Sequence, residues 1–368
     1  MIKVFDPNIR TEEALSALRD VFNSGWVGMG EKVQTFEDQM ADYLGCKKFV
    51  ALNSCTAALH LSIKVLNLPK NSNILVTPVT CPAPNLVALQ ERLVPIFYDI
   101  DPLTGSASVD SIKKLIKENS NITAIILVHI GGYPCDMDQI QELCDDNNIK
   151  IIEDCAHALG SIYKDRKIGN SNNLCCFSFH SLKNLTTGDG GGVATNNLTY
   201  AERIKQLSWY GGTKHTYQRL TSTSYTWNYD IFEQGLKYHM NDVTAAIGIV
   251  QLQYLDEDNK LRKKVAERYI NELNVTIPAY ENNRLSSYHF LPIHVKNRQQ
   301  VIKALNDNDI YPSVHYERND EYDIFRQYKT KLEGVTQYCQ TELTLPIHPK
   351  LTNNDVTSII KIVNKTAK

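Results

Sequence analysis

The chain has 368 residues, of which 42% are hydrophobic and 22% charged, a composition typical of a globular protein with about two domains. Its formal net charge is −2 and its charges are interspersed, which favours a small ligand over a nucleic acid. No window approaches the roughly 18 apolar residues that span a bilayer, and the N-terminus lacks the apolar core of a signal peptide. We therefore expect no membrane contact and a cytoplasmic location.

The nine cysteines show no CxxC spacing and stand mostly in apolar runs. This pattern predicts reduced thiols that pack as small hydrophobic side chains, with neither a disulfide framework nor a zinc site. The histidines are scattered without HExxH spacing, so we expect no metal site.

Strands and helices alternate in the first half of the chain. Residues Thr11 to Gly25 predict an amphipathic helix with a threonine cap and a glycine stop, and a second helix follows at 31–44. Strands are then predicted at 47–52, 74–78, 94–99, 124–130 and 150–153, with helices after residue 53 and at 83–91, 108–118 and 137–145. The alternation predicts an α/β fold whose large domain has a mainly parallel central sheet flanked by helices.

The second half completes this domain and adds a smaller one. Two more strands are predicted at 174–179 and 191–195, followed by a helix at 200–209 and a long helix from about 241 to 273. Beyond it we predict strands at 288–295 and 311–315 and helices at 298–307 and 355–363. We therefore expect a large domain over residues 1–255 and a small C-terminal α+β domain over residues 256–368.

Lys183 lies where the sequence changes from an apolar run to a polar, glycine-rich segment. The apolar run from Leu174 to Phe179 breaks into a turn rich in hydroxyl groups around Lys183, and the glycines from Gly188 to Gly192 follow. This predicts a constrained turn just past a strand end, where the active groups of open α/β sheets collect. On the local pattern alone, Lys183 is better explained as a solvated surface charge.

Three strand ends combine into a possible cofactor site. Asp154 ends one strand, Ser178 and Lys183 follow another, and Ser54-Cys-Thr56 opens a helix whose amides can hold a phosphate. A carboxylate, an amine and an anion cradle suit pyridoxal phosphate (PLP). Both Asp154 and the Ser-x-Thr turn are also explained as helix caps. Rossmann and P-loop motifs are not matched, because no GxxxxGK[ST] occurs and the glycine run fails GxGxxG at its last position.

The block from Cys176 to Gly191 resembles the lysine signature of the DegT/StrS family of sugar aminotransferases, which are PLP enzymes of the aspartate aminotransferase fold, fold type I. The resemblance extends over nearly the whole chain. The other matching segments are Gly25-Trp26, Asn53 to Leu59, Glu153 to His157, Tyr238 to Gln251 and Leu343 to Pro346.

The resemblance implies a role for individual residues. Lys183 would be the Schiff-base lysine, Asp154 the partner of the pyridine nitrogen, and His157 a contact of the cofactor hydroxyl. Phosphate contacts are implied for Thr56, Ala57, Ser178 and, from a second subunit, Lys237; substrate contacts are implied for Trp26, His315 and Tyr316, with Arg318 beside them as the best candidate for a charge contact. His157 and the aromatic residues are equally well explained as core, and we expect His180 to be structural.

Four positions depart from the family pattern. Cys55 replaces a usual glycine, and Cys81 stands where an aromatic commonly stacks on the cofactor ring. Lys237 replaces an asparagine and His239 an arginine. What stacks on the ring is therefore left open, while a lysine can bind the phosphate as a point charge.

The resemblance implies a homodimer with shared active sites that moves an amino group from an amino acid, expected to be glutamate, to a keto group on a nucleotide-linked deoxysugar. A related PLP- or PMP-dependent dehydratase is the main alternative, but such enzymes carry histidine in place of Lys183. A non-catalytic sensor with this fold would have no need of the Asp154 and Lys183 pair. The nucleotide, the sugar stereochemistry, the carbon aminated and the group that holds the donor carboxylate are left open.

Overall fold

A seven-stranded sheet with the order β1-β9-β8-β5-β4-β2-β3 lies at the centre of the computed structural model, which describes residues 1–213, 216–221 and 229–368. The strands are β1 (Lys48–Leu52), β2 (Asn73–Val76), β3 (Val94–Phe97), β4 (Ile122–Val128), β5 (Lys150–Asp154), β8 (Leu174–Ser178) and β9 (Gly191–Thr195). Strand β9 is antiparallel to β1 and β8, whereas the pairs among β8, β5, β4, β2 and β3 are parallel. The predicted mainly parallel α/β sheet is confirmed.

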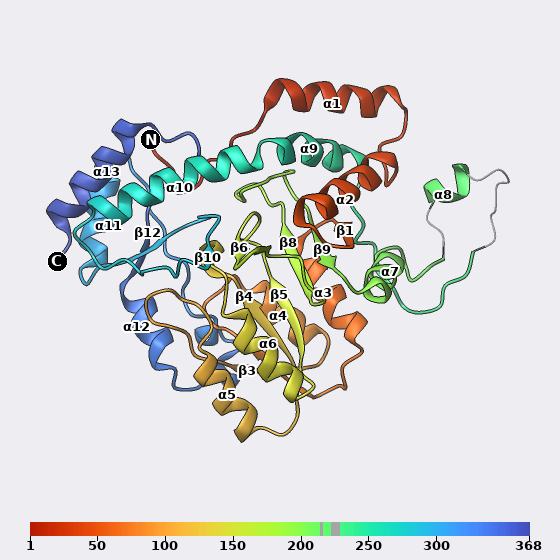
Figure 1. Ribbon diagram of the computed structural model, residues 1–368, viewed down its shortest axis with the longest axis horizontal. Coiled ribbons are helices and arrows are strands. Elements are labelled where there is room, and N and C mark those ends of the chain that lie inside the picture. The colour runs from red at the N-terminus through yellow and green to blue at the C-terminus, as the bar shows by residue number, and fades with distance from the viewer. Residues whose placement is uncertain (214–215, 222–228) are drawn as a thin grey trace.

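Helices lie before, between and after these strands in the chain, and most of them pack around the sheet (Figure 1). They are α1 (Thr11–Asn23), α2 (Glu31–Leu44), α3 (Cys55–Leu66), α4 (Ala83–Gln90), α5 (Val109–Glu118), α6 (Met137–Asp146), α7 (Leu198–Leu207), α8 (Thr216–Thr221) and α9 (Asp242–Gln253). Strands such as β8 are buried along their whole length, because helices shield both faces of the sheet. None of the described helices combines the length and apolarity needed to cross a bilayer.

The C-terminal part has a hydrophobic cluster of its own, built around Val265, Ile293 and Ile359. Its elements are α10 (Leu255–Glu272), β11 (Pro292–His294), α11 (Arg298–Asn306), α12 (Glu333–Thr341), β12 (Glu342–Thr344) and α13 (Asn353–Thr366), with β11 antiparallel to β12. A separate small sheet joins β10 (Arg284–Leu285) to β6 (Ile162–Tyr163) and β7 (Arg166–Lys167). The domain boundary at residue 255 stays a prediction.

Two predicted elements are wrong in detail. The long helix breaks at Tyr254, and the acidic residues Asp256, Glu257 and Asp258 then favour a new helix start because they face the positive end of its dipole. Residues 311–315 form no strand: Ser313 makes an isolated bridge to Thr344, and Pro312 has no N–H to extend a ladder.

The glycine that opens β9 allows α3 to begin directly against the sheet. A Cβ atom added to Gly191 would lie 2.4 Å from the amide nitrogen of Cys55 and 2.6 Å from the carbonyl oxygen of Ser54. These are backbone atoms, so neither can rotate away. Gly191 therefore sets how closely the N-terminus of α3 approaches the strand ends.

Replacing Gly191 by alanine should lower the free energy of unfolding by about 1–3 kcal/mol, because the backbone at the start of α3 must move. Urea unfolding measures the change. Gly28→Ala is a matched control, since an added Cβ there meets nothing closer than 3.6 Å. Equal stability of the two variants would contradict the argument.

Candidate active site

A cavity of about 340 Å³ lies at the ends of β5 and β8 and the start of α3. It brings together five predicted site residues, Thr56, Asp154, His157, Ser178 and Lys183. The remaining residues that line it are Ser54, Cys55, Leu59, Thr80, Cys81, Ala83, Ala156, His180, Asp189 and Gly190. The parallel strands β5 and β8 end at the same edge of the sheet, so their terminal residues meet although they lie far apart in sequence.

The start of α3 forms one wall of the cavity. Ser54 caps the helix, and its Oγ accepts a hydrogen bond from the amide of Ala57 at 3.1 Å. Ala57 is buried and does not line the cavity, whereas the hydroxyl-bearing residues Thr56 and Ser178 do. Helix N-terminal amides together with hydroxyl groups form a place where a phosphate can bind.

Lys183 and Asp154 face this cavity from the turn after β8 and the end of β5. Burial raises the pKa of Asp154, while a hydrogen bond from the Ala156 amide at 3.0 Å and the charge of Lys183 oppose the rise. Burial likewise lowers the pKa of Lys183, and Asp154 opposes the fall. The amine is therefore closer to its unprotonated, nucleophilic form than a surface lysine is.

His157 is held as a neutral ring. Burial, then Lys183 and His315, keeps its pKa well below the usual range. Its Nε2 lies 3.0 Å from the hydroxyl of Tyr316, and its ring stacks on that of His289 at 4.6 Å. Tyr316, expected at the substrate, thus contacts a predicted cofactor residue.

Besides Ala57 and Tyr316, four predicted site residues do not line the cavity of their own subunit. Arg318 binds both carboxylate oxygens of the buried Asp320, at 2.7 and 2.6 Å, so its guanidinium is already engaged. His315 is buried, with Nδ1 2.9 Å from Thr344 Oγ1, and burial lowers its pKa to about 3. The indole of Trp26 donates to the Met29 carbonyl at 3.1 Å, and the Lys237 amine lies 3.1 Å from the centre of the Trp209 ring.

Two of the unusual residues lie inside the cavity. Cys55 Sγ is 4.0 Å from Asp154 Oδ1, and Cys81 lines the same cavity. Burial raises the pKa of both thiols, so they add no negative charge. His180, expected to be structural, also lines the cavity; its position three residues before Lys183 was the only sequence signal for this.

The groups present fit PLP. The cavity offers an amine for the aldehyde, a carboxylate for the ring nitrogen, a neutral histidine and a cradle for the phosphate. These are the groups of Lys183, Asp154, His157 and the start of α3.

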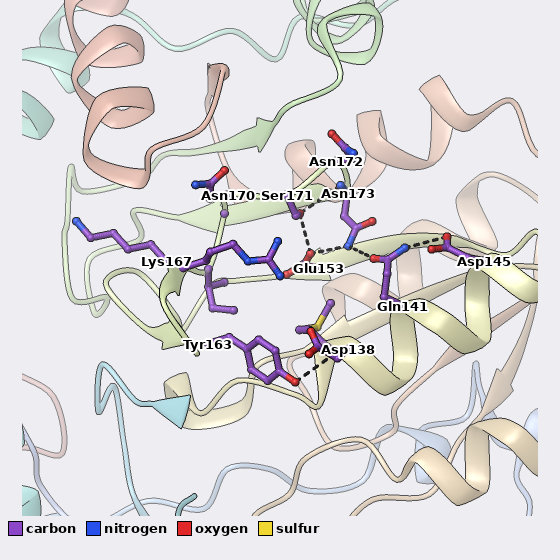
Figure 2. A pocket seen from close by; sticks show the side chains of 14 residues that line it. Asp138, Gln141, Asp145, Glu153, Tyr163, Lys167, Asn170, Ser171, Asn172 and Asn173 are labelled. Carbon is purple, nitrogen blue, oxygen red and sulfur yellow. Dashed lines mark hydrogen bonds between the residues drawn. The ribbon is translucent and has the colours of Figure 1, made fainter. Parts of the chain in front are cut away.

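A second pocket, of about 260 Å³, opens on the carboxylate of Glu153 (Figure 2). Glu153 precedes Asp154 on β5 and so points to the opposite face of the sheet. It accepts hydrogen bonds from Ser171 at 3.1 Å, Asn173 at 2.8 Å and His129 Nε2 at 3.1 Å. Burial works to raise the pKa of Glu153, but the bonds from His129, Asn173 and Ser171 together lower it.

The ligand atoms of His129, Glu153 and Cys155 lie within 4.8 Å of one another, a group of the kind that can hold a metal. The amide of Cys135 donates to His129 Nδ1 at 3.1 Å, so both ring nitrogens of His129 have partners. The contacts present are those of a buried hydrogen-bond network that supports the end of β5.

The family model of the DegT/DnrJ/EryC1/StrS aminotransferase family matches residues 8–364. The chain is 32% identical to a UDP-4-amino-4,6-dideoxy-N-acetyl-beta-L-altrosamine transaminase of Campylobacter jejuni, over 92% of this chain and 89% of that protein. It is 30% identical to a dTDP-4-dehydro-2,3,6-trideoxy-D-glucose 4-aminotransferase of Saccharopolyspora spinosa, over 98% and 95%. The structure of a putative sugar aminotransferase, Spr1654, from Streptococcus pneumoniae in its PMP form superposes with a TM-score of 0.90 at 27% identity, over 98% of each chain.

Arg318→Ala should lower the free energy of unfolding by about 3 kcal/mol, because it leaves the carboxylate of Asp320 buried without its partner. Urea unfolding checks this, and the double variant Arg318→Ala/Asp320→Ala should regain part of the loss. Unchanged stability together with a raised Michaelis constant would instead support the substrate contact expected from the sequence.

Proposed function

The chain belongs to the DegT/DnrJ/EryC1/StrS aminotransferase family, and from this we propose that it moves an amino group from glutamate to the keto group of a nucleotide-linked sugar. It is a PLP-dependent aminotransferase with the fold type I architecture. The observation that carries the proposal is the pairing of Lys183 and Asp154 in one cavity, in a chain whose relatives are named as transaminases of UDP- and dTDP-linked sugars.

The residues divide the work of the reaction. When bound, PLP supplies an electron-accepting ring that stabilises the charge left as a proton leaves the donor carbon. Asp154 would bind and orient the ring through its nitrogen, and the neutral His157 would contribute a hydrogen bond to its hydroxyl. The start of α3 and Ser178 would bind the phosphate. Lys183, an amine with a lowered pKa that lines the same cavity, would take up the proton and return it.

The described cavity wall supports a neutral acceptor. Amino-acid aminotransferases commonly hold a substrate carboxylate with a bidentate arginine. None of the described residues that line the cavity is an arginine, and Arg318 is engaged by Asp320. We therefore propose that the acceptor is a keto-sugar recognised through its nucleotide. A dehydratase is less well supported, because Lys183 stands where such enzymes carry histidine.

We also propose that the working unit is a homodimer with shared active sites. The segment before Lys237 exposes the apolar side chains of Tyr229, Ile231 and Phe232, which are 43%, 53% and 66% exposed. Helix α8, from the same region, stands away from the body of the subunit in Figure 1. Such a surface suits burial against a second copy, where the Lys237 amine would reach the cofactor phosphate.

The cytoplasm is the proposed location. All nine cysteines are free, and Cys135, Cys144 and Cys155 are buried as thiols. Reduced thiols persist in a reducing compartment.

The purified PLP-bound protein should aminate at least one member of a panel of UDP- and dTDP-linked keto-sugars with glutamate as donor, as read by product mass. Lys183→Ala should give no product, because the residue that moves the proton is gone. Transfer to simple 2-keto acids, with no turnover of any nucleotide keto-sugar, would show that the proposed substrate class is wrong.

Mixing two inactive variants, Lys183→Ala and Lys237→Ala, should restore about one quarter of the wild-type activity. Half of the randomly paired dimers then carry one site with both lysines intact. Lys183→Ala mixed with Asp154→Ala is the control and should restore nothing, since both residues belong to the same subunit's site. No recovery in the first mixture would contradict the shared site.

A further inference from the structure

Asn184, which follows the active-site lysine, uses both polar atoms of its side chain inside the protein. The residue is 9% exposed. Its Nδ2 donates to Asn259 Oδ1 at 2.8 Å and to the Ser287 carbonyl oxygen at 3.0 Å, and its Oδ1 lies 3.0 Å from His289 Nδ1. One amide thus joins the lysine turn to α10 and to the segment that precedes β11.

These contacts determine which terminal atom of the Asn184 side chain is the oxygen and which is the nitrogen. A carbonyl oxygen only accepts, so the nitrogen of the Asn184 amide must face Ser287. Asn259 agrees, because its own Nδ2 donates to the Leu159 carbonyl at 3.1 Å and leaves Oδ1 as the acceptor. The oxygen of Asn184 therefore faces His289, and the proton of that ring must sit on Nδ1.

His289 carries this single proton on Nδ1, and its fixed ring in turn holds the ring of His157 by stacking against it. Burial, then Lys183 and His157, keeps the pKa of His289 well below the usual range, so the ring is neutral. The His289 and His157 rings are stacked at 4.6 Å with 18° between their planes, and Phe5 also stacks on His289. Ser287 Oγ donates to the His157 carbonyl oxygen at 2.8 Å.

The turn that contains Lys183 and Asn184 follows β8, and the loop that contains His157 follows β5. Both segments nevertheless contact residues 287–289. We propose that Asn184 is a positioning residue: through its amide it sets where Lys183 stands relative to His157 and Asp154. The inference rests on the proposed proton transfer by Lys183. A displacement of about 1 Å at a reacting group can lower the rate by about 100-fold. Glutamate binding does not depend on the exact position of the Lys183 amine. The rate constant of proton transfer, rather than the affinity for glutamate, should therefore fall.

The test uses the PLP-bound protein and glutamate alone, so it needs no sugar acceptor. Glutamate should remove the visible absorbance of the bound cofactor, and Asn184→Ala should lower the saturating rate constant of this step by about tenfold or more. The glutamate concentration that gives half the maximal rate should change by less than about threefold. If Asn184→Ala does not fold, Asn259→Ser removes one of the three partners and should show a smaller loss of the same kind.

Asn297 offers a matched control far along the chain. Its Nδ2 donates to Gln300 Oε1 and to the Thr366 carbonyl oxygen, and its Oδ1 accepts from the Lys368 amide, each at 2.9 Å. Asn297→Ala therefore loses three side-chain hydrogen bonds, as Asn184→Ala does, and should keep the wild-type rate constant.

A wild-type rate constant in the Asn184 variant, or an equal loss in Asn297→Ala, overturns the positioning role while the proposed function stands. Wild-type protein whose cofactor absorbance does not respond to any amino donor overturns the proposed function and the positioning role together.

Discussion

Lys183 and Asp154 are ionisable groups of opposite charge that line one cavity, the first from the turn after β8 and the second from the end of β5. Burial favours the neutral form of each, while each group favours the charged form of the other. This balance gives an amine that is readily deprotonated beside a carboxylate that can bind a protonated ring nitrogen. Such a pair is stable only if its surroundings supply hydrogen bonds and hold the geometry. The Ala156 amide is one such donor, and the Glu153 network supports the same strand from its other face.

Three histidines and two thiols near the pair are kept uncharged. His157, His289 and His315 all have pKa values lowered first by burial and then by Lys183. The thiols of Cys55 and Cys81, at two of the positions that depart from the family pattern, are held protonated by burial. These five side chains therefore act on the pair by hydrogen bonding and packing rather than by a competing charge. Thiols in place of a glycine and an aromatic change the shape of the cavity without changing this electrostatic arrangement.

The parts of the site that follow from local pattern were predictable from the sequence. Strand ends, the glycine-rich turn and the cap at Ser54 depend on neighbouring residues, and they place Asp154, Lys183 and Thr56 correctly at one cavity. Partners that come from distant segments were not predictable. From the sequence, Arg318 looked free to contact a substrate. Asp320 is only two residues away, but its complete burial, which makes it a firm partner for Arg318, is a tertiary effect. The break between α9 and α10 at Tyr254 was not predictable either, since the helical periodicity of the sequence continues across it.

Residues near the N-terminus and residues of the C-terminal part pack together beside His157, and this links the chemistry of the site to the packing of the C-terminal part. Phe5, Val128, Ile130 and Phe290 form one hydrophobic cluster, against which Tyr316 packs. Tyr316 and His289 both contact the ring of His157, and His289 is tied to Asn184 beside the lysine. A shift of residues 287–289 cannot occur without straining either the His157 stack or the Asn184 amide. Because the reacting groups are held from two directions, displacement of the C-terminal segments relative to the sheet changes the position of Lys183 as well as the shape of the cavity.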